Sequence, residues 1–407
     1  MRRVVVIGAG AAGTMAAIFA AANGARTTLV ERTEDGGRKI LISGGGRCNI
    51  LPARLDESRF VTDSSPHTLR RILRSWPLEE QIAFFEREVG IALKEEAESA
   101  KLFPVSDRAR DVRDGLLALA RHKGVEIMTS TLVTDLTTDS NATWTIARRG
   151  AASLEADAVI VATGGLSVPN TGSDGTGLTI AEALGHRINP TYAALTPLVA
   201  QPAPFASLSG VSLPVTITAR TPDDTLRATA QGGFLFTHIG YSGPAVLDVS
   251  HVAVRSKNND AARLTVQWSR LDDRQWTDAL KPSGSRTVVA ALRAELPQRL
   301  AAALVDRADI DPQLTLANLT RASRLRLIDL LVRGPLPWTG DEGYKKAEVT
   351  GGGVDLAEVD HKTLQSRRCP GLFLCGEMLD AFGPIGGYNF FWAWATGRAA
   401  GLGASLL

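Results

Sequence analysis

The sequence predicts an α/β protein built on a parallel sheet, and three short segments support this fold class. A β-branched run from Val4 to Ile7 is followed at once by spaced glycines and an alanine-rich stretch, the pattern of a buried strand that leads into a helix. Two later apolar runs also end in glycine, "VIVATGG" at residues 159–165 and "GLFLCGE" at residues 371–377. Parallel strands bring such turns together at one sheet edge, where open α/β sheets bind their ligands.

The first segment carries the most specific motif. "GAGAAG" has G-x-G-x-x-G spacing, and an alanine-rich helix, a second strand and Glu31 follow it. In a dinucleotide-binding unit, Gly8 allows the tight turn, Gly10 lets a pyrophosphate approach the backbone, and Gly13 lets the helix pack on the strand. The helix N-terminus supplies N–H groups for the phosphates, and Glu31 accepts hydrogen bonds from ribose hydroxyls. Since a carboxylate disfavours a 2′-phosphate, the motif predicts FAD or NAD rather than NADP.

Composition excludes several classes of protein. The chain has 407 residues, which suggests two or three domains, and a net charge of only +2, which gives no overall field for nucleic acid or anionic membrane. Three cysteines, Cys48, Cys369 and Cys375, lack C-x-x-C spacing, so we expect no disulfide framework and a cytoplasmic protein. The six histidines show no metal-ligand spacing, and no metal site is expected. No uninterrupted apolar run is long enough to predict a membrane span.

A glycine-rich stretch, "GGRKILISGGGRCNI" at residues 36–50, favours a flavin over a nicotinamide. It is too rich in glycine for the interior of a helix or strand, so we expect an ordered, partly buried loop. Arg38 and Lys39 are placed to face phosphates or the adenosine. The glycines at 44–46 permit backbone contact with a large flat group, which an isoalloxazine ring would satisfy. A nicotinamide dehydrogenase would normally continue with another strand and helix here, so the stretch predicts FAD.

At this point the sequence resembles a known family. The segment "GRKILISGGGRCN" is similar to the signature of bacterial FAD-dependent oxidoreductases of the aminoacetone oxidase and bile-acid enone reductase-like group, related to ribosomal RNA dihydrouridine synthase. Four further segments match that family, so the resemblance covers nearly the whole chain: "VIVATGGLSVPNTGSDGTGLTIAEALGH" (159–186), "FTHIGYSGPAVLDVS" (236–250), "AEVTGGGV" (347–354) and "GLFLCGEMLDAFGPIGGYNFFWAWATGRAAG" (371–401).

The resemblance implies reduction of conjugated C=C bonds. Some relatives act on bile-acid enones and others on a uracil of ribosomal RNA, and both substrates are α,β-unsaturated carbonyl compounds. Hydride from flavin N5 would add to the β-carbon, and an acid would protonate the α-carbon. The chain departs from the family pattern in two places: Ile50-Leu51-Pro52 stands where relatives usually have a Val/Ile-Thr-Asn triplet, and Phe391 stands where many have Gln.

The motifs and the resemblance together predict a set of cofactor-binding residues. The "GGYN" segment is expected to open a helix at 390–402 whose N-terminus faces the N1/O2 edge of the flavin, where it would stabilise the anionic reduced form. Either Glu377 or Asp380 is expected to bind ribityl hydroxyls. The full set is Gly8, Gly10, Ala12, Gly13, Glu31, Arg32, Arg38, Lys39, Ser43, Gly44, Gly45, Arg47, Cys48, Asn49, Val133, Ala162, Thr163, Gly164, Gly165, Gly376, Glu377, Asp380, Gly386, Gly387, Tyr388 and Asn389.

Candidate catalytic residues are fewer. Cys48 lies beside the glycines and is a candidate proton donor, although a lone small thiol favours packing. His238 and Tyr241 lie in "FTHIGYSGP", a loop shaped by glycine and proline in a domain expected to cover the flavin; a structural role is the alternative for the histidine. Cys369 and Cys375 flank an apolar run and are expected in the core.

The distribution of strand-like and helix-like segments along the sequence also predicts the domain organisation. Residues 1–190 and 343–407 are expected to form a discontinuous FAD-binding domain of the Rossmann type. Residues 191–280 read as a β-rich domain that covers the substrate, and residues 281–342 as a small helical domain. Amphipathic helices are expected at 64–90 and 107–123.

The sequence therefore predicts an FAD-dependent oxidoreductase that reduces an enone-type bond of a small molecule, with NADH or NADPH as a transient reductant. A ribosomal RNA uridine reductase is the first alternative, and a non-catalytic flavin-containing binding module is the second. Low net charge argues against RNA, but Arg70, Arg71 and Arg74 share one expected helix. Arg321, Arg324 and Arg326 share another, and RNA would be favoured if these two clusters lined the same cleft as the flavin.

Overall fold

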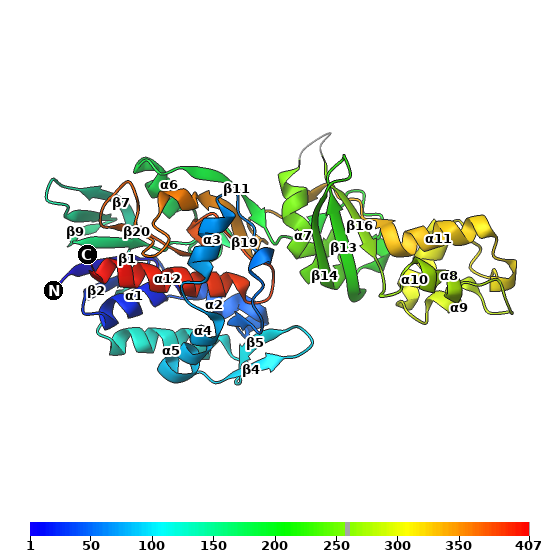
Figure 1. Ribbon diagram of the computed structural model, residues 1–407, viewed down its shortest axis with the longest axis horizontal. Coiled ribbons are helices and arrows are strands. Elements are labelled where there is room, and N and C mark those ends of the chain that lie inside the picture. The colour runs from blue at the N-terminus through cyan, green and yellow to red at the C-terminus, as the bar shows by residue number, and fades with distance from the viewer. Residues whose placement is uncertain (257–260, 407) are drawn as a thin grey trace. The chain divides into compact units, whose positions relative to one another are not determined.

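The computed structural model describes residues 1–256 and 261–406, and the chain divides into two compact units. Unit 1 comprises Met1–Ala193 and Glu348–Leu407, and unit 2 comprises Ala194–Ala347. The two ends of the chain therefore build one unit, and unit 2 is an insertion between them (Figure 1). The sequence placed these boundaries near residues 190 and 343.

Unit 1 is built around a five-stranded parallel sheet with the N-terminal β-branched run at its centre. Its strands are, in sheet order, β20 (Leu372–Leu374), β10 (Ala158–Val161), β1 (Arg3–Ile7), β2 (Arg26–Val30) and β6 (Glu126–Met128). In register, Val5 of β1 lies between Val159 of β10 and Thr28 of β2. Residues Val4 to Ile7 are all buried, as expected for a central strand covered on both faces.

Two long helices pack closely on each other in unit 1. They are α1 (Ala11–Ala22) and α12 (Tyr388–Leu406). A Cβ atom added at Gly397 would lie 2.3 Å from the carbonyl oxygen of Ala12, and one at Gly401 would lie 2.3 Å from that of Ala16. These glycines therefore let the two backbones approach, and α12 is buried along most of its length, beyond the expected bounds of 390–402.

The other α-helices of unit 1 lie between its strands in the chain. The segment 64–90 was expected to be helical, but the structure breaks it at Pro77, which is extended (φ −57°, ψ 154°) and has no N–H to continue a helix. The expected helix at 107–123 is present. Their bounds are α2 (Arg38–Ile42), α3 (Pro66–Leu73), α4 (Leu78–Phe84), α5 (Ala109–His122) and α6 (Thr176–Ala183).

Three small sheets complete unit 1. One has the order β3 (Leu51–Pro52), β5 (Lys101–Pro104), β4 (Leu93–Glu96), and another has the order β7 (Val133–Thr138), β8 (Trp144–Arg148), β9 (Ala151–Ala156). The third pairs β11 (Ile188–Ala194) with β19 (Val349–Val354). These last two strands lie where the chain leaves unit 1 and where it returns.

Unit 2 contains a seven-stranded antiparallel sheet and five α-helices among the described residues. Its strands are, in sheet order, β17 (Gly334–Pro335), β16 (Arg263–Gln267), β13 (Ser212–Arg220), β14 (Leu226–Phe236), β15 (Gly240–Ser242), β12 (Leu198–Val199) and β18 (Gly340–Asp341). Its helices are α7 (Pro244–Arg255), α8 (Asp273–Ala279), α9 (Val288–Leu292), α10 (Gln298–Arg307) and α11 (Arg321–Arg333).

One hydrophobic core joins the strands and helices of unit 2. Val215 and Phe234 of the sheet belong to the same buried cluster as Leu300 and Leu327 of the helices. The segments 191–280 and 281–342, expected as two domains, therefore share a core. None of the helices in the described part of the chain is long and apolar enough to cross a membrane.

Candidate functional site

A cavity of about 470 Å³ opens in unit 1 at the carboxyl edge of the parallel sheet. Its wall includes the last residues of β1 and β2, Ile7 and Val30, and residues one or two positions after β10 and β20, Ala162 and Gly376. Ligands of open α/β sheets bind at this edge, because the turns that follow parallel strands converge there. The two later apolar runs of the sequence thus reach the same cavity as the first glycine motif.

The three glycines of the first motif have different surroundings. A Cβ atom at Gly13 would lie 1.8 Å from the carbonyl oxygen of Gly8, so Gly13 lets α1 pack on the strand. Gly8 has a φ of 99°, and a Cβ there would lie 2.6 Å from the carbonyl oxygen of Ala162. Gly10 lines the cavity, and a Cβ there would meet no protein atom within 4 Å. Gly10 is therefore the glycine that leaves room for a ligand.

The N-terminus of α1 faces this space. No side chain caps the helix, and Gly10, Ala11 and Ala12 all line the cavity. The first N–H groups of a helix have no partner within the helix and carry a partial positive charge. An uncapped N-terminus in a cavity wall therefore fits a phosphate or pyrophosphate group.

Glu31, directly after β2, is held in a fixed orientation at the cavity wall. Its side chain is 7% exposed, and its Oε2 accepts a hydrogen bond from the backbone N of Ala9 at 2.8 Å. Its Oε1 accepts hydrogen bonds from the backbone N and the hydroxyl of Thr33, at 2.8 and 2.7 Å. Each carboxylate oxygen has more than one acceptor position, so Glu31 can still accept hydrogen bonds from ribose hydroxyls.

The glycine-rich stretch contains a short helix, contrary to the loop expected from its composition. Arg38–Ile42 forms α2, which begins after Gly37 at a φ of 72°. Residues 43–46 then form a tight turn in which all three glycines have positive φ, 56° to 85°. A Cβ at Gly45 would meet no protein atom within 4 Å, and Gly45 lines the cavity. Glycine is needed here for the backbone conformation and for open space beside it.

A polar cluster fixes Glu377 at the cavity wall. Lys39 donates hydrogen bonds from Nζ to Glu377 Oε2 at 2.5 Å and to the hydroxyl of Ser167 at 2.8 Å. Glu377 Oε1 accepts from the backbone N and the hydroxyl of Thr350, both at 3.0 Å, and from the Ser167 hydroxyl. Sequence reasoning missed Ser167 and Thr350. Their position could have indicated a role at the site, because Ser167 lies close to the glycines at 164–165 and Thr350 lies directly before the glycines at 351–353.

The turn before α12 forms another part of the wall. Gly386 and Gly387 have φ of 126° and 89°, and both line the cavity. The side-chain amide of Asn389 binds both backbone groups of Gly383 at 2.9 Å, which closes the loop ahead of the helix. The side-chain oxygen of Asn49, with its amide oriented to satisfy both neighbours, accepts from the backbone N of Gly387 at 2.9 Å. The N-terminus of α12 thus faces the cavity.

Most of the residues predicted to bind the cofactor line this cavity. They are Gly8, Gly10, Ala12, Glu31, Arg32, Arg38, Lys39, Ser43, Gly44, Gly45, Arg47, Asn49, Val133, Ala162, Thr163, Gly164, Gly376, Glu377, Gly386, Gly387 and Asn389. The others predicted, Gly13, Cys48, Gly165, Asp380 and Tyr388, are not part of its wall.

Four of those five residues have structural surroundings instead. Gly13 and Gly165 are packing positions, since a Cβ at Gly165 would lie 2.4 Å from the Thr350 hydroxyl. The Tyr388 hydroxyl donates to the carbonyl oxygen of Arg54 at 3.3 Å. Cys48 is fully buried at a φ of 62°, and burial raises its pKa to about 12. Because the thiol is buried and is not part of the cavity wall, its position favours packing over a role as proton donor.

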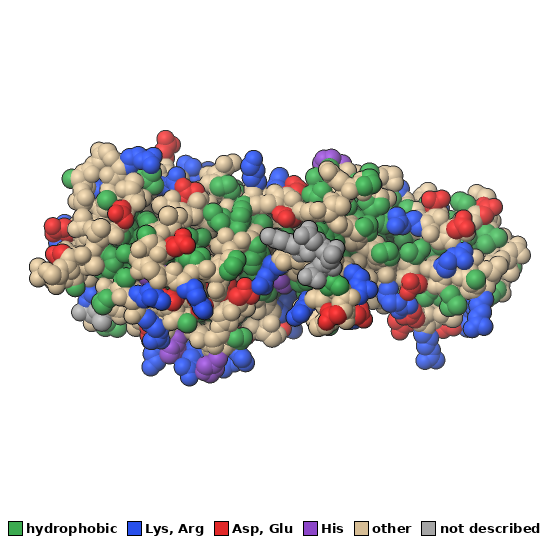
Figure 2. All heavy atoms as spheres, turned by 90° about the horizontal axis from the view of Figure 1, so that it is seen from above, with side chains coloured by type: hydrophobic (Ala, Val, Ile, Leu, Met, Phe, Trp, Pro, Cys, Tyr) green, Lys and Arg blue, Asp and Glu red, His purple; other side chains and the backbone are tan. Residues whose placement is uncertain are grey.

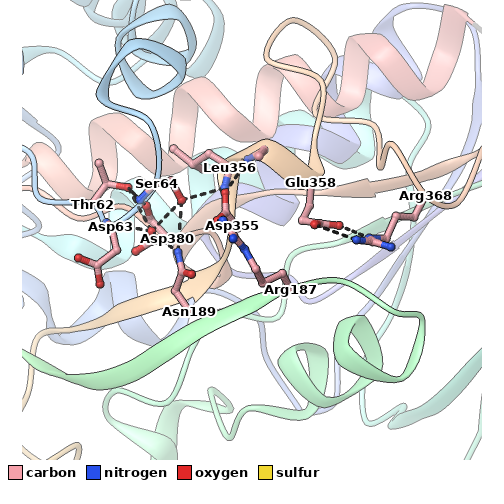
Figure 3. A network of polar contacts seen from close by, with 11 residues as sticks. Thr62, Asp63, Ser64, Arg187, Asn189, Asp355, Leu356, Glu358, Arg368 and Asp380 are labelled. Carbon is pink, nitrogen blue, oxygen red and sulfur yellow. Dashed lines mark hydrogen bonds and ion pairs between the residues drawn. The ribbon is translucent and has the colours of Figure 1, made fainter.

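Asp380, the fifth, lies at the centre of a buried polar network (Figure 3). Its Oδ2 accepts hydrogen bonds from the backbone N of Asp63 at 3.0 Å, the hydroxyl of Ser64 at 2.8 Å and the amide of Asn189 at 2.7 Å. Ser64 Oγ also accepts from the backbone N of Leu356 at 3.0 Å. Asp380 therefore connects the segments that carry Asp63, Ser64 and Asn189. Of the two carboxylates predicted to bind ribityl hydroxyls, the geometry favours Glu377, because only Glu377 is part of the cavity wall.

The two remaining catalytic candidates belong to unit 2. Tyr241 is 1% exposed and packs among Phe205, Phe234 and Phe236, with ring centroids 5.7 to 6.4 Å away. Its hydroxyl has no hydrogen-bond partner among the described residues, and burial raises its pKa. Enclosure in that core argues against a catalytic role for Tyr241. His238 is exposed in the turn between β14 and β15.

The arginine cluster of unit 1 does not line the cavity. Arg70, Arg71 and Arg74 are exposed on and just after α3, and Arg74 pairs with Glu57 at 2.9 Å. The cluster on α11 lies in unit 2, where Arg326 donates to the carbonyl oxygen of Ala308. Figure 2 shows Lys and Arg side chains over the displayed face with acidic side chains among them. No group of three or more His, Cys, Asp or Glu residues suited to a metal ion occurs in the described ranges.

The residues of the cavity fit FAD. The uncapped helix α1, the fixed carboxylate of Glu31 and the open spaces at Gly10 and Gly45 match a pyrophosphate, a ribose and a flat ring. The hydroxyl of Thr163 is buried in the wall and has no hydrogen-bond partner among the described groups. Its position in the wall would allow a bound ligand to supply that hydrogen bond.

Comparison with known proteins gives consistent matches over the whole chain. A family model described as the HI0933-like protein Rossmann domain matches residues 2–403. The chain is 31% identical to the ribosomal RNA dihydrouridine synthase of Haemophilus influenzae, over 98% of each protein. It is 32% identical to the 3-dehydro-bile acid delta(4,6)-reductase of Clostridium scindens, over 100% of this chain and 99% of that protein. The ribosomal RNA dihydrouridine synthase of Escherichia coli is also 32% identical, over 97% and 96%.

Solved structures share the fold at lower identity. The chain aligns with 3-ketosteroid-delta4-(5alpha)-dehydrogenase from Rhodococcus jostii RHA1 at a TM-score of 0.51 and 16% identity, over 100% of this chain and 97% of that one. A flavocytochrome c3 fumarate reductase in its open conformation aligns at a TM-score of 0.51 and 15% identity, over 99% and 78%. Both likenesses concern the fold alone.

Proposed function

The chain belongs to the HI0933-like family of FAD-dependent oxidoreductases, and from this premise we propose that it reduces a C=C bond conjugated to a carbonyl group in a small-molecule substrate. Relatives named for a bile acid delta(4,6)-reductase and for ribosomal RNA dihydrouridine synthases support this reaction class. A 3-dehydro-bile acid with Δ4,6 unsaturation and a uracil ring differ greatly in size. They share an alkene conjugated to a carbonyl.

One observation carries the proposal most directly: the cavity combines a complete dinucleotide cradle with a second end that favours negative charge. At the first end, Glu31 and the uncapped N-terminus of α1 would hold ribose and pyrophosphate. At the second, the N-terminus of α12 contributes partial positive charge through the turn at Gly386. Reduction of an enone places negative charge on an oxygen, so this end suits that reaction.

The protein's own contribution is binding and orientation. When bound, FAD supplies hydride transfer, which no amino-acid side chain provides. Lys39, Ser167 and Thr350 hold Glu377 in one orientation at the wall, where its carboxylate is available to ribityl hydroxyls. The turn at Gly44 and Gly45 leaves open space beside the backbone for a flat ring. NADH or NADPH is proposed as a transient reductant.

Ribosomal RNA is the second candidate substrate, because two of the named relatives act on it. Arg70 and Arg71 on α3 are exposed and would be available for phosphate contacts. Against RNA stand the net charge of +2 and the position of this cluster outside the cavity wall. We therefore rank the small molecule first.

Deletion of the gene separates the two candidates. Mass spectrometry of ribosomal RNA nucleosides from the deletion strain is expected to show unchanged dihydrouridine. The matched measurement follows anaerobic oxidation of NADH or NADPH by purified protein with a panel of enones. Loss of dihydrouridine that the intact gene restores would make RNA the substrate. Failure of every enone, with dihydrouridine unchanged, would contradict both candidates.

A further inference from the structure

The cavity wall carries five cationic side chains among the residues that the structure describes, and four of them are already paired with a carboxylate. The four pairs are Arg32 with Asp174, Arg38 with Asp35 (2.8 Å), Lys39 with Glu377 (2.5 Å) and Arg47 with Glu96 (2.9 Å). A cation paired in this way has its charge largely balanced by the protein.

Lys101 is the fifth cation, and it differs from the others. No carboxylate of residues 1–256 and 261–406 lies within 4.0 Å of its Nζ, and no hydrogen bond from its side chain to those residues is present. Lys101 begins β5, where it pairs with Pro52 of β3. The ammonium group has three donors and no direct acceptor among the described residues, although its charge acts on the carboxylates of Glu348 in the same wall and Glu96 opposite it on β4.

The position of Lys101 places this charge at the α12 end of the cavity. Its side chain runs along Gly386, since a Cβ added to that glycine would lie 3.8 Å from Lys101 Cε. Gly386 lies in the turn that leads into α12, so the ammonium and the helix N-terminus bring positive charge to the same region. Donors gathered around one point are the arrangement that stabilises a developing oxyanion.

Resting on the proposed function, we propose that Lys101 binds the carbonyl oxygen of the substrate and stabilises it as an enolate during reduction. Hydride arrives at the β-carbon from the reduced flavin, and the π electrons of the C=C bond move toward the oxygen. Lys101 then balances the negative oxygen. A proton from solvent adds to the α-carbon and restores the carbonyl group. The flavin is left oxidised, and a reduced nicotinamide coenzyme returns it to the reduced state.

Binding of a phenol tests this role of Lys101 without turnover. A phenolate resembles an enolate, and one that stacks on oxidised flavin gives a long-wavelength absorption band, so para-chlorophenol can be titrated into the oxidised holoprotein. Lys101→Met is expected to weaken binding about tenfold or more, as for loss of a hydrogen bond to a charged group. Lys101→Arg should retain part of the binding. Lys94→Met is the matched control, because Lys94 lies on the adjacent strand β4, pairs with Asp107 and is not part of the cavity wall.

Single-turnover kinetics add the catalytic readout. Anaerobic reoxidation of the reduced protein by cyclohexenone should slow about 100-fold or more in Lys101→Met, the usual effect of losing one oxyanion donor. Reoxidation by oxygen should slow far less than reoxidation by cyclohexenone, since it does not involve a substrate carbonyl.

The outcomes separate the two proposals. Equal para-chlorophenol binding in Lys101→Met and wild type, or no binding by the wild type, would overturn the role of Lys101. A shifted flavin potential with unchanged phenol binding would also overturn it, because Lys101 would then act on the cofactor. Phenol binding that depends on Lys101, in a protein that reduces no enone and no uridine, would support this site while contradicting the proposed function.

Discussion

Gly10 and Gly13 belong to one motif, yet the structure predicts opposite consequences for replacing them with alanine. Gly10 has a φ of −77° and a ψ of −168°, which alanine adopts freely, and a Cβ there meets no protein atom within 4 Å. We expect Gly10→Ala to change the stability of the apoprotein by less than about 0.5 kcal/mol. In Gly13→Ala the new Cβ would lie 1.8 Å from the carbonyl oxygen of Gly8, and overpacking of this kind costs about 1–3 kcal/mol or more.

Although Gly10→Ala should leave the stability of the apoprotein almost unchanged, we expect it to weaken the binding of FAD. The added methyl group would project into the cavity at the N-terminus of α1, where the backbone must approach the pyrophosphate. Loss of one hydrogen bond to a charged phosphate costs about 1.5–3 kcal/mol. That loss corresponds to an increase in the Kd for FAD of about 10- to 100-fold.

The assay uses apoprotein from which the flavin has been removed. Thermal unfolding reports stability, and quenching of flavin fluorescence reports binding. Gly340→Ala is the matched control, because Gly340 in unit 2 is equally open and does not line the cavity. A Gly10→Ala apoprotein that unfolds several degrees below wild type, or that binds FAD normally, would refute this assignment.

Three further perturbations follow from the polar contacts and pKa values. Asp380→Ala leaves the buried donors of its network without an acceptor and should lower the free energy of unfolding by about 3 kcal/mol or more in urea titrations; an unchanged midpoint would contradict the network. Lys39→Met and Glu377→Gln should each weaken FAD binding, with a coupling energy of about 1 kcal/mol in the double variant, because the two side chains are in direct contact; additive losses would mean that the pair is unimportant. Burial raises the pKa of Cys48 to about 12, so its thiol stays protonated in the folded state while the unfolded state ionises near about 8.5. This stabilisation is complete below about pH 8.5 and falls by about 1.4 kcal/mol per pH unit as pH rises toward 12; Cys48→Ala should lack that part of the alkaline loss.

The parts of the fold that could be predicted from sequence depend on short-range patterns. The run from Val4 to Ile7, the glycine spacing and Glu31 lie within one strand–helix–strand unit, so their geometry follows from local rules. The later glycine turns reach the same cavity because parallel strands end at one edge. For these features, the types of residue and their spacing were enough to predict the structure, without knowledge of which distant residues they contact.

Other features depend on contacts between distant segments. Ser167 and Thr350 bind Glu377 across separations of 210 and 27 residues, and no spacing in the sequence shows this. Asp380 was expected at the ligand because it lies close to Glu377. Leu379 between them is extended (ψ 146°), and Asp380 enters a different, buried network. Cys48 was considered both as a packing residue and as a proton donor, and its side chain is buried in the core, with a left-handed backbone at φ 62°.

Single-turnover reoxidation is the measurement that tests the proposed reaction most directly. The purified flavoprotein is reduced under anaerobic conditions and mixed with one equivalent of an enone or with unmodified ribosomal RNA. We expect the visible absorbance of oxidised flavin to return with an enone, and mass spectrometry to show a product that has gained two hydrogen atoms in a matching amount. A flavin that stays reduced with every enone and with RNA, or a purified protein that holds no flavin, would contradict the proposed function.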